Sequence, residues 1–382
     1  MTINLPSYRD INLSKIPLKW GYYSIGLVEK YCPDLHLIGI RMNRKKNINQ
    51  FGSIKLRHSE VDYSWLSAEI EQAIKSGKKA ILLFNDEQIF YEKNDQLTEI
   101  INYYKDEPVY GISAFEPDRI TQHYRDRHGL ECNMLEFPFI NFNECLVYDK
   151  IRSLRNCPYF LPNMDQNCDD TFFAVTGRYE SFRKTLLTTL IDRKLNTHGI
   201  LTILKDNVEL FSDLKEYITV DSYDPYYRVP VSDHEKMGAQ FLETENIWLS
   251  CNTKNFLYIE QQYQKYPLVI VPESCPYDFF STEKSFWPAL IGKLFLTIGS
   301  LGSMNYMQKF YDVDMSKFLN LEFDRADVSI EERIEMMIDQ NRDFILNSKK
   351  IYAENLDEIQ TAKNTITPNM YKFLLSQLNK IE

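Results

Sequence analysis

Hydrophobic and polar positions along the chain form blocks that predict helices followed by short buried strands. In residues 64–77, apolar side chains recur three and four positions apart, and Gly77 is a typical helix end. The next block, KAILLF at 79–84, predicts a buried strand, and EPVYGISAF at 107–115 and LHLIGI at 35–40 predict two more. Helix followed by strand, repeated, is the pattern of an α/β layer.

The same pattern continues in the second half of the chain. Apolar runs predict strands at 171–177, 199–204, 267–271 and 294–299, and helical periodicity predicts helices at 179–195, 303–310, 329–346 and 368–381. Ser329 and Glu332 have the spacing of a capping box. Residues 205–262 are polar and irregular, so they could form a surface excursion or a loop over a site.

The length of the chain, 382 residues, suits about two domains. Residues around 150–168 are rich in Pro, Asn and Asp and have little periodicity, which predicts a connection between domains. We therefore expect an α/β domain at 1–165 and a second at 166–350. A C-terminal helical segment, 351–382, could pack back on the first domain.

Composition narrows the class of protein. The chain is 44% hydrophobic and 14% aromatic, which is typical of a globular protein. Its seven cysteines form no C-x-x-C pair and its six histidines no ligand pair, so no disulfide framework or zinc site is expected. The first residues lack the apolar core of a signal peptide, and no run reaches about 18 apolar residues. These features predict a soluble cytoplasmic protein with no membrane span.

Net charge bears on the partners. The formal charge of −10 is not that of a dedicated nucleic-acid binder. Basic residues are nevertheless dense at 41–47 and 123–130, both in the expected first domain. These patches are either solvated faces or a contact surface for nucleic acid.

A candidate phosphate site lies where the strand at 267–271 leads into a helix. Thr282 is a natural cap, and Lys284 stands in the first turn, where a lysine opposes the helix dipole unless an anion is bound. Glu283 is suited to accept hydrogen bonds from ribose hydroxyls, and Glu273, at the end of the strand, from a sugar. Together these groups suggest a nucleotide-sugar site.

A second turn of this kind lies upstream. The strand at 171–177 ends at Gly177, followed by Arg178, and Arg183 and Lys184 stand in the first turns of the next helix. Cations at another helix start would again be matched by a diphosphate. Ligands bind at the carboxyl ends of strands in open α/β sheets, so the two turns support one site.

These motifs resemble the donor domain of α1,3-fucosyltransferase-type glycosyltransferases, especially those of phages and large viruses. The resemblance covers about 170–345. It rests on the strand-G-R-x₄-R turn and on a set of later residues: Glu273, Thr282-Glu283-Lys284, Pro288, Phe295, Gly299, FLNLEFD at 318–324 and ERI at 332–334.

The resemblance implies a GT-B fold, in which two Rossmann-like domains face each other across a cleft, and a cytoplasmic enzyme, in the host if it is viral. It implies that Arg183 and Lys284 neutralise a diphosphate and that Glu283 holds the ribose. The implied activity is transfer of a sugar from a nucleotide-sugar to an acceptor hydroxyl. DVD at 312–314 lies too late in the chain for the metal-binding motif of the other glycosyltransferase fold, so we expect no metal and no further cofactor.

The first domain would supply the acceptor site and the base. Asp86 and Glu87 follow the strand at 79–84, and Glu116 follows the strand at 107–115, so each is a candidate base. The acceptor is either a glycan or a hydroxymethylated base in viral DNA, which the basic patches would favour. A non-catalytic binding protein of the same fold is a further alternative. The donor sugar, the stereochemistry and the oligomeric state stay open.

Overall fold

Parallel β-sheet forms the framework of both halves of the chain. The computed structural model describes residues 3, 5–19, 22–40, 61–84, 93–113, 125–126, 129–136, 139–154, 170–176, 180–204, 218–220, 247, 263–273 and 283–381. The chain divides into two units: Met1–Ile140 with Tyr371–Glu382, and Asn141–Met370. The division expected at 165/166 therefore falls within the second unit, in a stretch outside the described residues.

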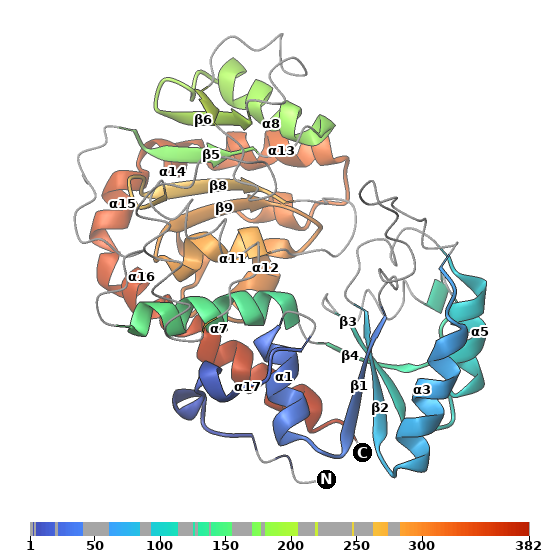
Figure 1. Ribbon diagram of the computed structural model, residues 1–382. Coiled ribbons are helices and arrows are strands. Elements are labelled where there is room, and N and C mark those ends of the chain that lie inside the picture. Colours follow the sequence, from blue (N-terminus) through green and yellow to red (C-terminus); the bar gives the residue numbers. More distant parts are fainter. Residues whose placement is uncertain are drawn as a thin grey trace. The chain divides into compact units, whose positions relative to one another are not determined.

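The first unit contains a sheet whose strands lie in chain order. These are β1 (Leu35–Ile40), β2 (Lys79–Phe84), β3 (Val109–Ser113) and β4 (Asn133–Glu136), all parallel. Its described helices include α1 (Tyr23–Tyr31), α3 (Ser64–Lys75) and α5 (Asp95–Tyr103), with short 3₁₀ turns at Tyr8–Asp10 and Leu13–Lys15. In Figure 1, α3 and α5 cover one face of this sheet and α1 lies against the other.

The described residues of the second unit include a sheet of five parallel strands. These are β5 (Phe172–Val175), β6 (Gly199–Leu204), β7 (Ile218–Val220), β8 (Leu268–Pro272) and β9 (Leu294–Ile298). The described helices wholly within this unit are α8 (Ser181–Asp192), α11 (Glu283–Leu290), α12 (Ser303–Gln308), α13 (Ile330–Gln340), α14 (Arg342–Leu346), α15 (Ser348–Glu354) and α16 (Leu356–Ala362), with 3₁₀ turns η6 (Met315–Lys317) and η7 (Glu322–Asp324). The boundaries between the units fall in α7 (Phe139–Ser153) and α17 (Ile366–Leu378).

The order of strands in the second sheet is β7-β6-β5-β8-β9. The connection from β5 to β6 contains α8 and runs one way along the sheet, whereas that from β8 to β9 contains α11 and runs the other way. Right-handed crossovers therefore place α8 and α11 on opposite faces. α8 packs on α13, and α11 and α12 contact β9 (Figure 1). All of β8 and β9 is buried, as expected when helices cover both faces of a parallel sheet.

The prediction of an α/β protein is confirmed, and several elements match closely. β1, β2 and β6 have the predicted bounds, Gly77 follows the end of α3 with φ of 71°, and the capping box of Ser329 and Glu332 begins α13. The elements α1, α5, α7, β4 and β7 were not predicted, whereas the predicted helical segment at 351–382 contains α16, α17 and the end of α15.

One prediction is wrong: residues 329–346 form two helices, α13 and α14, and not one. Asn341 lies between them, and its side-chain amide donates to the carbonyls of Asn320 and Met337, both at 3.0 Å. Its side-chain oxygen accepts from the Asn320 N–H at 2.8 Å. The side chain competes with the helical backbone, and the helix is interrupted there.

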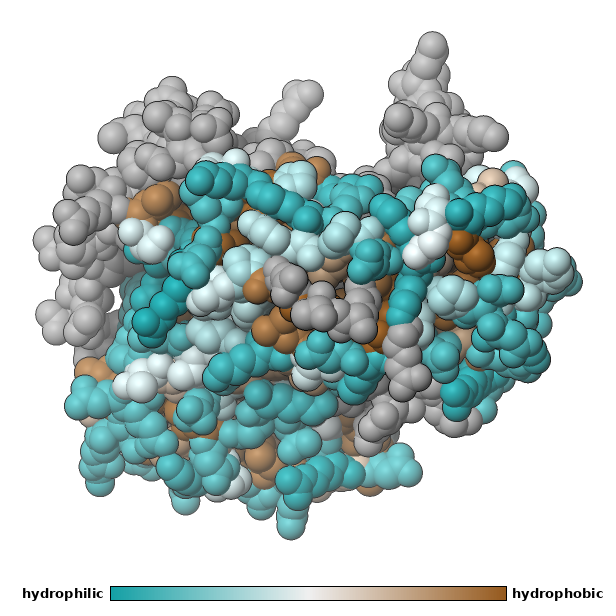
Figure 2. Space-filling view, turned by 90° about the horizontal axis from the view of Figure 1, so that it is seen from below, coloured by the Kyte–Doolittle hydropathy of each residue, from teal (hydrophilic) through white to brown (hydrophobic). Residues whose placement is uncertain are grey.

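A few large hydrophobic side chains are exposed at the surface of the described part. Figure 2 shows one face on which hydrophobic side chains are interspersed among hydrophilic ones. Tyr103, Leu18, Val328 and Leu356 are the large hydrophobic side chains most exposed among the described residues. None of the helices described has the length and apolar character needed to cross a bilayer.

Candidate functional site

The second sheet has a topological switch point between β5 and β8. In the unit's own count the strand order is 3-2-1-4-5, the order of doubly wound nucleotide-binding folds, and the connections leave β5 and β8 in opposite directions. Ligands of such sheets bind outside the carboxyl ends of the two strands that flank this point. Residues that follow β5 and β8 are therefore the first place to seek a site.

Arg183 spans the switch point. It lies in the first turn of α8, after β5, and its Nη2 donates to the carbonyl oxygen of Glu273, directly after β8, at 3.0 Å. Its guanidinium also lies over the ring of Phe182, with 5.5 Å from Cζ to the ring centroid. Only 4% of Arg183 is exposed. The arginine expected to meet a diphosphate thus stands at the predicted place and also ties two strand ends together.

The Glu273 side chain is fully buried. Ser285 donates its hydroxyl to Glu273 Oε1, so the carboxylate is held by the first turns of α11. A Cβ at Gly299 would lie 3.2 Å from Glu273 Cγ, which shows how closely the end of β9 approaches this side chain. The backbone N–H of Glu273 donates to the carbonyl of Ile298 at 2.9 Å. Glu273 is therefore buried at the switch point, below the surface on which a sugar was expected to bind. We call Glu273, with Ser285 and Gly299 packed around it, the floor of the switch point.

Three of the described helices, α8, α11 and α12, follow the carboxyl ends of strands in this sheet, and α8 and α12 differ in how their N-termini are satisfied. α12 receives the carboxylate of Asp324, which accepts from the backbone N–H groups of Met304 and Asn305 at 3.2 and 3.1 Å. The cap residue of α8, Glu180, makes no side-chain capping hydrogen bond. The positive end of α12 is thus already matched by the chain's own carboxylate. Of the described helix starts, α8 thus has no side-chain cap, and the residue that precedes α11 lies outside the described residues.

Asp324 and Arg333 are two buried charged residues that interact electrostatically, and each is hydrogen-bonded to the backbone. Arg333, on α13, donates from Nε to the carbonyl of Phe323 and from Nη1 to that of Gly299, both at 2.9 Å. Burial raises the pKa of Asp324 to about 6, against the opposing effects of the N–H groups of α12 and the charge of Arg333. Burial also lowers the pKa of Arg333, which Asp324 opposes.

The predicted phosphate-binding segment begins α11. Glu283 is the first residue of the helix and Lys284 the second, so the expected helix start at 282–284 is reproduced. Lys284 is partly exposed, and in the sequence it follows the buried Glu273. Thr282, Gly177 and Arg178 lie outside the described residues, as does the side chain of Glu283.

The residues expected to serve the acceptor lie mostly outside the described part. Asp86, Glu87 and Glu116, the candidate bases, are among them. So are most basic residues of 41–47 and 123–130, although Arg125 is described and exposed. The acceptor side of the site thus stays a prediction.

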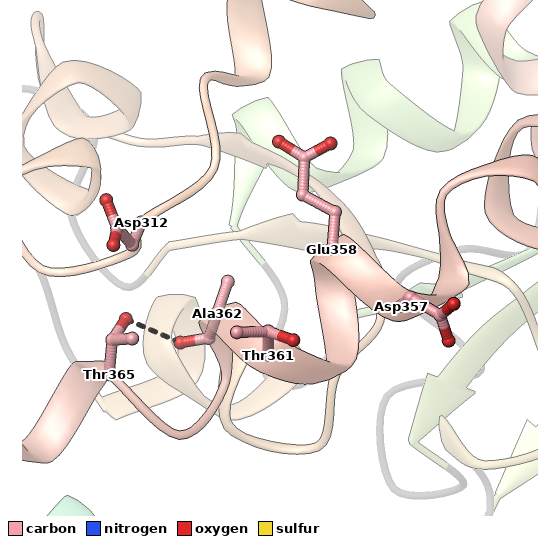
Figure 3. A pocket seen from close by; sticks show the side chains of 6 residues that line it. All are labelled: Asp312, Asp357, Glu358, Thr361, Ala362 and Thr365. Atoms are coloured by element: carbon pink, nitrogen blue, oxygen red, sulfur yellow. Dashed lines mark hydrogen bonds between the residues drawn. The ribbon is translucent and has the colours of Figure 1, made fainter.

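A cavity of about 280 Å³ lies elsewhere in the second unit (Figure 3). Its lining is acidic: Asp312, Asp357, Glu358, Thr361, Ala362 and Thr365. Glu358 pairs with Lys317 at 2.9 Å, and none of the predicted donor-binding residues lines the cavity. Asp314, the second aspartate of DVD, caps η6 by accepting from the Ser316 N–H at 3.0 Å. Within the described ranges no cluster of His, Cys, Asp or Glu has the arrangement of a metal site.

Three side chains near the switch point were not predicted as site residues: Ser285, Asp324 and Arg333. Ser285 directly follows Lys284, and Asp324 and Arg333 lie in the segments FLNLEFD and ERI that carry part of the family resemblance. Those segments were the available signal, but their partners, Met304 and Gly299, are distant in sequence.

Comparisons of the chain with protein-family models, with curated proteins and with solved structures give no match.

Proposed function

We propose that the protein is a glycosyltransferase that moves a sugar from a nucleotide-sugar to an acceptor hydroxyl. The observation that carries the proposal is the pairing of Arg183 with the strand end at Glu273, across a switch point of nucleotide-binding strand order. The GT-B arrangement of two Rossmann-like domains is part of the proposal.

The charges at the switch point suit a diphosphate. Arg183 enters from α8, and Lys284 stands in the first turn of α11, so each side supplies a cation and a helix start. The competing helix start, at α12, is matched by Asp324. Arg183 and Lys284 each lie at the positive end of a helix dipole, which is unfavourable for a cation. A diphosphate that bridges α8 and α11 would offset this unfavourable placement.

The reaction follows from this placement of charge. When a sugar is transferred, negative charge develops on the departing nucleoside diphosphate. Fixed cations and helix N–H groups stabilise that charge in the transition state more than in the ground state. In this proposal, Arg183 and Lys284 stabilise the leaving group, Glu283 binds the ribose, and a carboxylate of the first domain removes the acceptor proton.

A thermal-shift panel with GDP, UDP, ADP, CDP and dTDP tests the proposal. Ligand at a hundredfold excess over Kd stabilises the folded state by about 2.7 kcal/mol, so one nucleotide should raise the Tm clearly above the others. Inorganic phosphate at the same concentration is the control for a general anion effect. No shift with any nucleotide, or an equal shift with phosphate, would contradict the proposal.

A chelation arm tests the role of the protein's own cations. We expect nucleotide binding to persist in EDTA, because Arg183 and Lys284 supply the positive charge. Loss of binding in EDTA that Mn²⁺ or Mg²⁺ restores would show that a metal ion performs this role.

A further inference from the structure

We propose that Asp324 and Arg333 are positioning residues of the candidate site, which hold the turn between β9 and α12 and through it the floor at Glu273. The proposal deepens the proposed function, on which its ligand-binding test rests. It assigns a role to a buried charged pair that no candidate binding or catalytic step uses.

The turn is held from two sides. On one side, Arg333 donates to the carbonyl of Gly299 at 2.9 Å, the first residue after β9. On the other side, the Asp324 carboxylate accepts from the N–H groups of Met304 and Asn305. The Gly302 N–H also donates to the backbone carbonyl of Asp324 at 2.7 Å. The turn therefore cannot shift without breaking several hydrogen bonds, of which those to Met304 and Gly299 are buried.

The turn contacts the floor of the switch point. A Cβ on Gly299 would come within 3.2 Å of Glu273 Cγ and 3.1 Å of Ser303 Oγ, so the three residues are closely packed. Ser303 Oγ in turn donates to Asp324 at 3.3 Å. A displacement of the turn would therefore move Glu273, whose carbonyl receives Arg183 and whose carboxylate receives Ser285.

The pair is costly to bury, which argues for a role beyond packing. Asp324 is 1% exposed and Arg333 is 3% exposed. Two apolar side chains of similar size would fill the same space with less desolvation. What a charged pair adds is direction: the guanidinium fork fixes two carbonyls and the carboxylate fixes two N–H groups.

Hydrogen–deuterium exchange of the Asp324→Asn variant tests the proposal without any ligand. Asn keeps the shape of the side chain but removes its charge. We expect exchange about tenfold faster at Gly302–Asn305 and also at Leu268–Glu273, where the Glu273 N–H reports on the floor. Lys79–Phe84, in the first unit, should be unchanged. Asp339→Asn is the matched control, because Asp339 pairs with Arg193 on an exposed face of α13.

Faster exchange at Gly302–Asn305 alone would overturn the proposal, since Asp324 would then be a simple helix cap. No change in either segment, or an equal change at Lys79–Phe84, would also overturn it. If Asp324→Asn does not fold, Arg333→Lys replaces it, because lysine keeps the charge but cannot reach the carbonyls of both Phe323 and Gly299.

The second readout is affinity for the nucleotide that stabilises the parent protein. Asp324→Asn should weaken binding about tenfold at a temperature where the variant is fully folded, and Asp339→Asn should not. Unchanged affinity would overturn the link from the pair to the ligand. If the parent binds no nucleotide, the proposed function fails, while the exchange experiment still decides whether the pair positions Glu273.

Discussion

The two sheets differ in strand order more than in composition. Both are parallel, and in both the central strands are buried, β8 throughout and β2 apart from its first residue, Lys79. The first runs β1-β2-β3-β4 in chain order, so its described connections all advance in one direction, whereas the second reverses between β5 and β8. Only a reversal leaves a gap between the helices that follow adjacent strands. Strand order, and not the chemistry of the strands, therefore places the candidate site in the second unit.

The largest effect that we expect is a loss of stability at the turn that follows β9. Arg333→Met removes the donors to Gly299 and Phe323 and leaves Asp324 buried without its positive neighbour. We expect the free energy of unfolding to fall by about 3–5 kcal/mol, because two buried carbonyls lose their donors and the buried Asp324 loses the positive charge that opposes its desolvation. Urea denaturation followed by circular dichroism measures it.

Arg193→Met is the control for that experiment. Arg193 pairs with Asp339 at 2.8 Å, but the pair is at the surface, where such pairs contribute at most about 1 kcal/mol. Equal losses in the two variants would show that the turn after β9 has no special dependence on Arg333.

The next effect concerns the ligand. Lys284→Ala should weaken binding of a nucleoside diphosphate by about 1.5–3 kcal/mol, the scale of a charged hydrogen bond, with little change in the stability of the free protein. Calorimetry measures the affinity. Lys317→Ala, which removes a lysine paired with Glu358 in the same unit, is the matched control. If both variants bind as well as the parent, the phosphate site is not at α11.

A smaller effect is expected from Lys293, between α11 and β9. Burial lowers the pKa of Lys293 to about 8, and its amine donates to the carbonyl of Gln264 at 2.8 Å. Because the folded-state pKa lies below the unfolded one, protonation disfavours the folded state. The unfolded chain then binds more protons, so this group's contribution to stability rises with pH from about 8 to about 10.5.

Lys293→Met should remove this rise, which we expect to be about 2 kcal/mol. Urea midpoints at pH 7.5 and pH 9.5 measure it for the parent and the variant. A parent whose stability is flat over this interval, or a variant that keeps the full rise, would contradict the assignment to Lys293.

The smallest effect compares one glycine from each unit. Gly299→Ala places a methyl group against Glu273 and Ser303, and we expect about 1 kcal/mol less stability and weaker nucleotide binding. Gly77→Ala introduces a side chain at φ of 71°, with nothing within 4 Å, so it should cost about 1 kcal/mol through backbone strain alone. If nucleotide binding changes equally in both variants, or in neither, then the packing around Glu273 does not influence the ligand.

The sequence predicted the strands well because a strand buried on both faces is a continuous apolar run. β2 and β6 were recognised with their bounds, since charged or polar residues flank them. The interruption at Asn341 was missed because its cause is a hydrogen bond to Asn320, twenty-one residues away. The helical periodicity of the sequence continues through Asn341, and nothing in it indicates that Asn320 is the hydrogen-bond partner.

The candidate site was predicted in part for the same reason. Arg183 and Lys284 stood out as cations at helix starts, which is a local property. That Arg183 reaches the carbonyl of Glu273 depends on the pairing of β5 with β8, across ninety residues of chain. The cap of α12 by Asp324 also comes from a distant residue, so local capping rules could not find it.

The division of the first unit between both ends of the sequence has a consequence for biosynthesis. Leu374 and Leu378 are fully buried members of this unit, and the hydroxyl of Tyr371 donates to the carbonyl of Pro6. A ribosome translates the whole second unit between the two parts, an interval on the order of ten seconds or more. During that time the second unit can fold from contiguous sequence, while the nascent first sheet lacks its last apolar partners. The unit whose synthesis begins first is therefore the unit that is completed last.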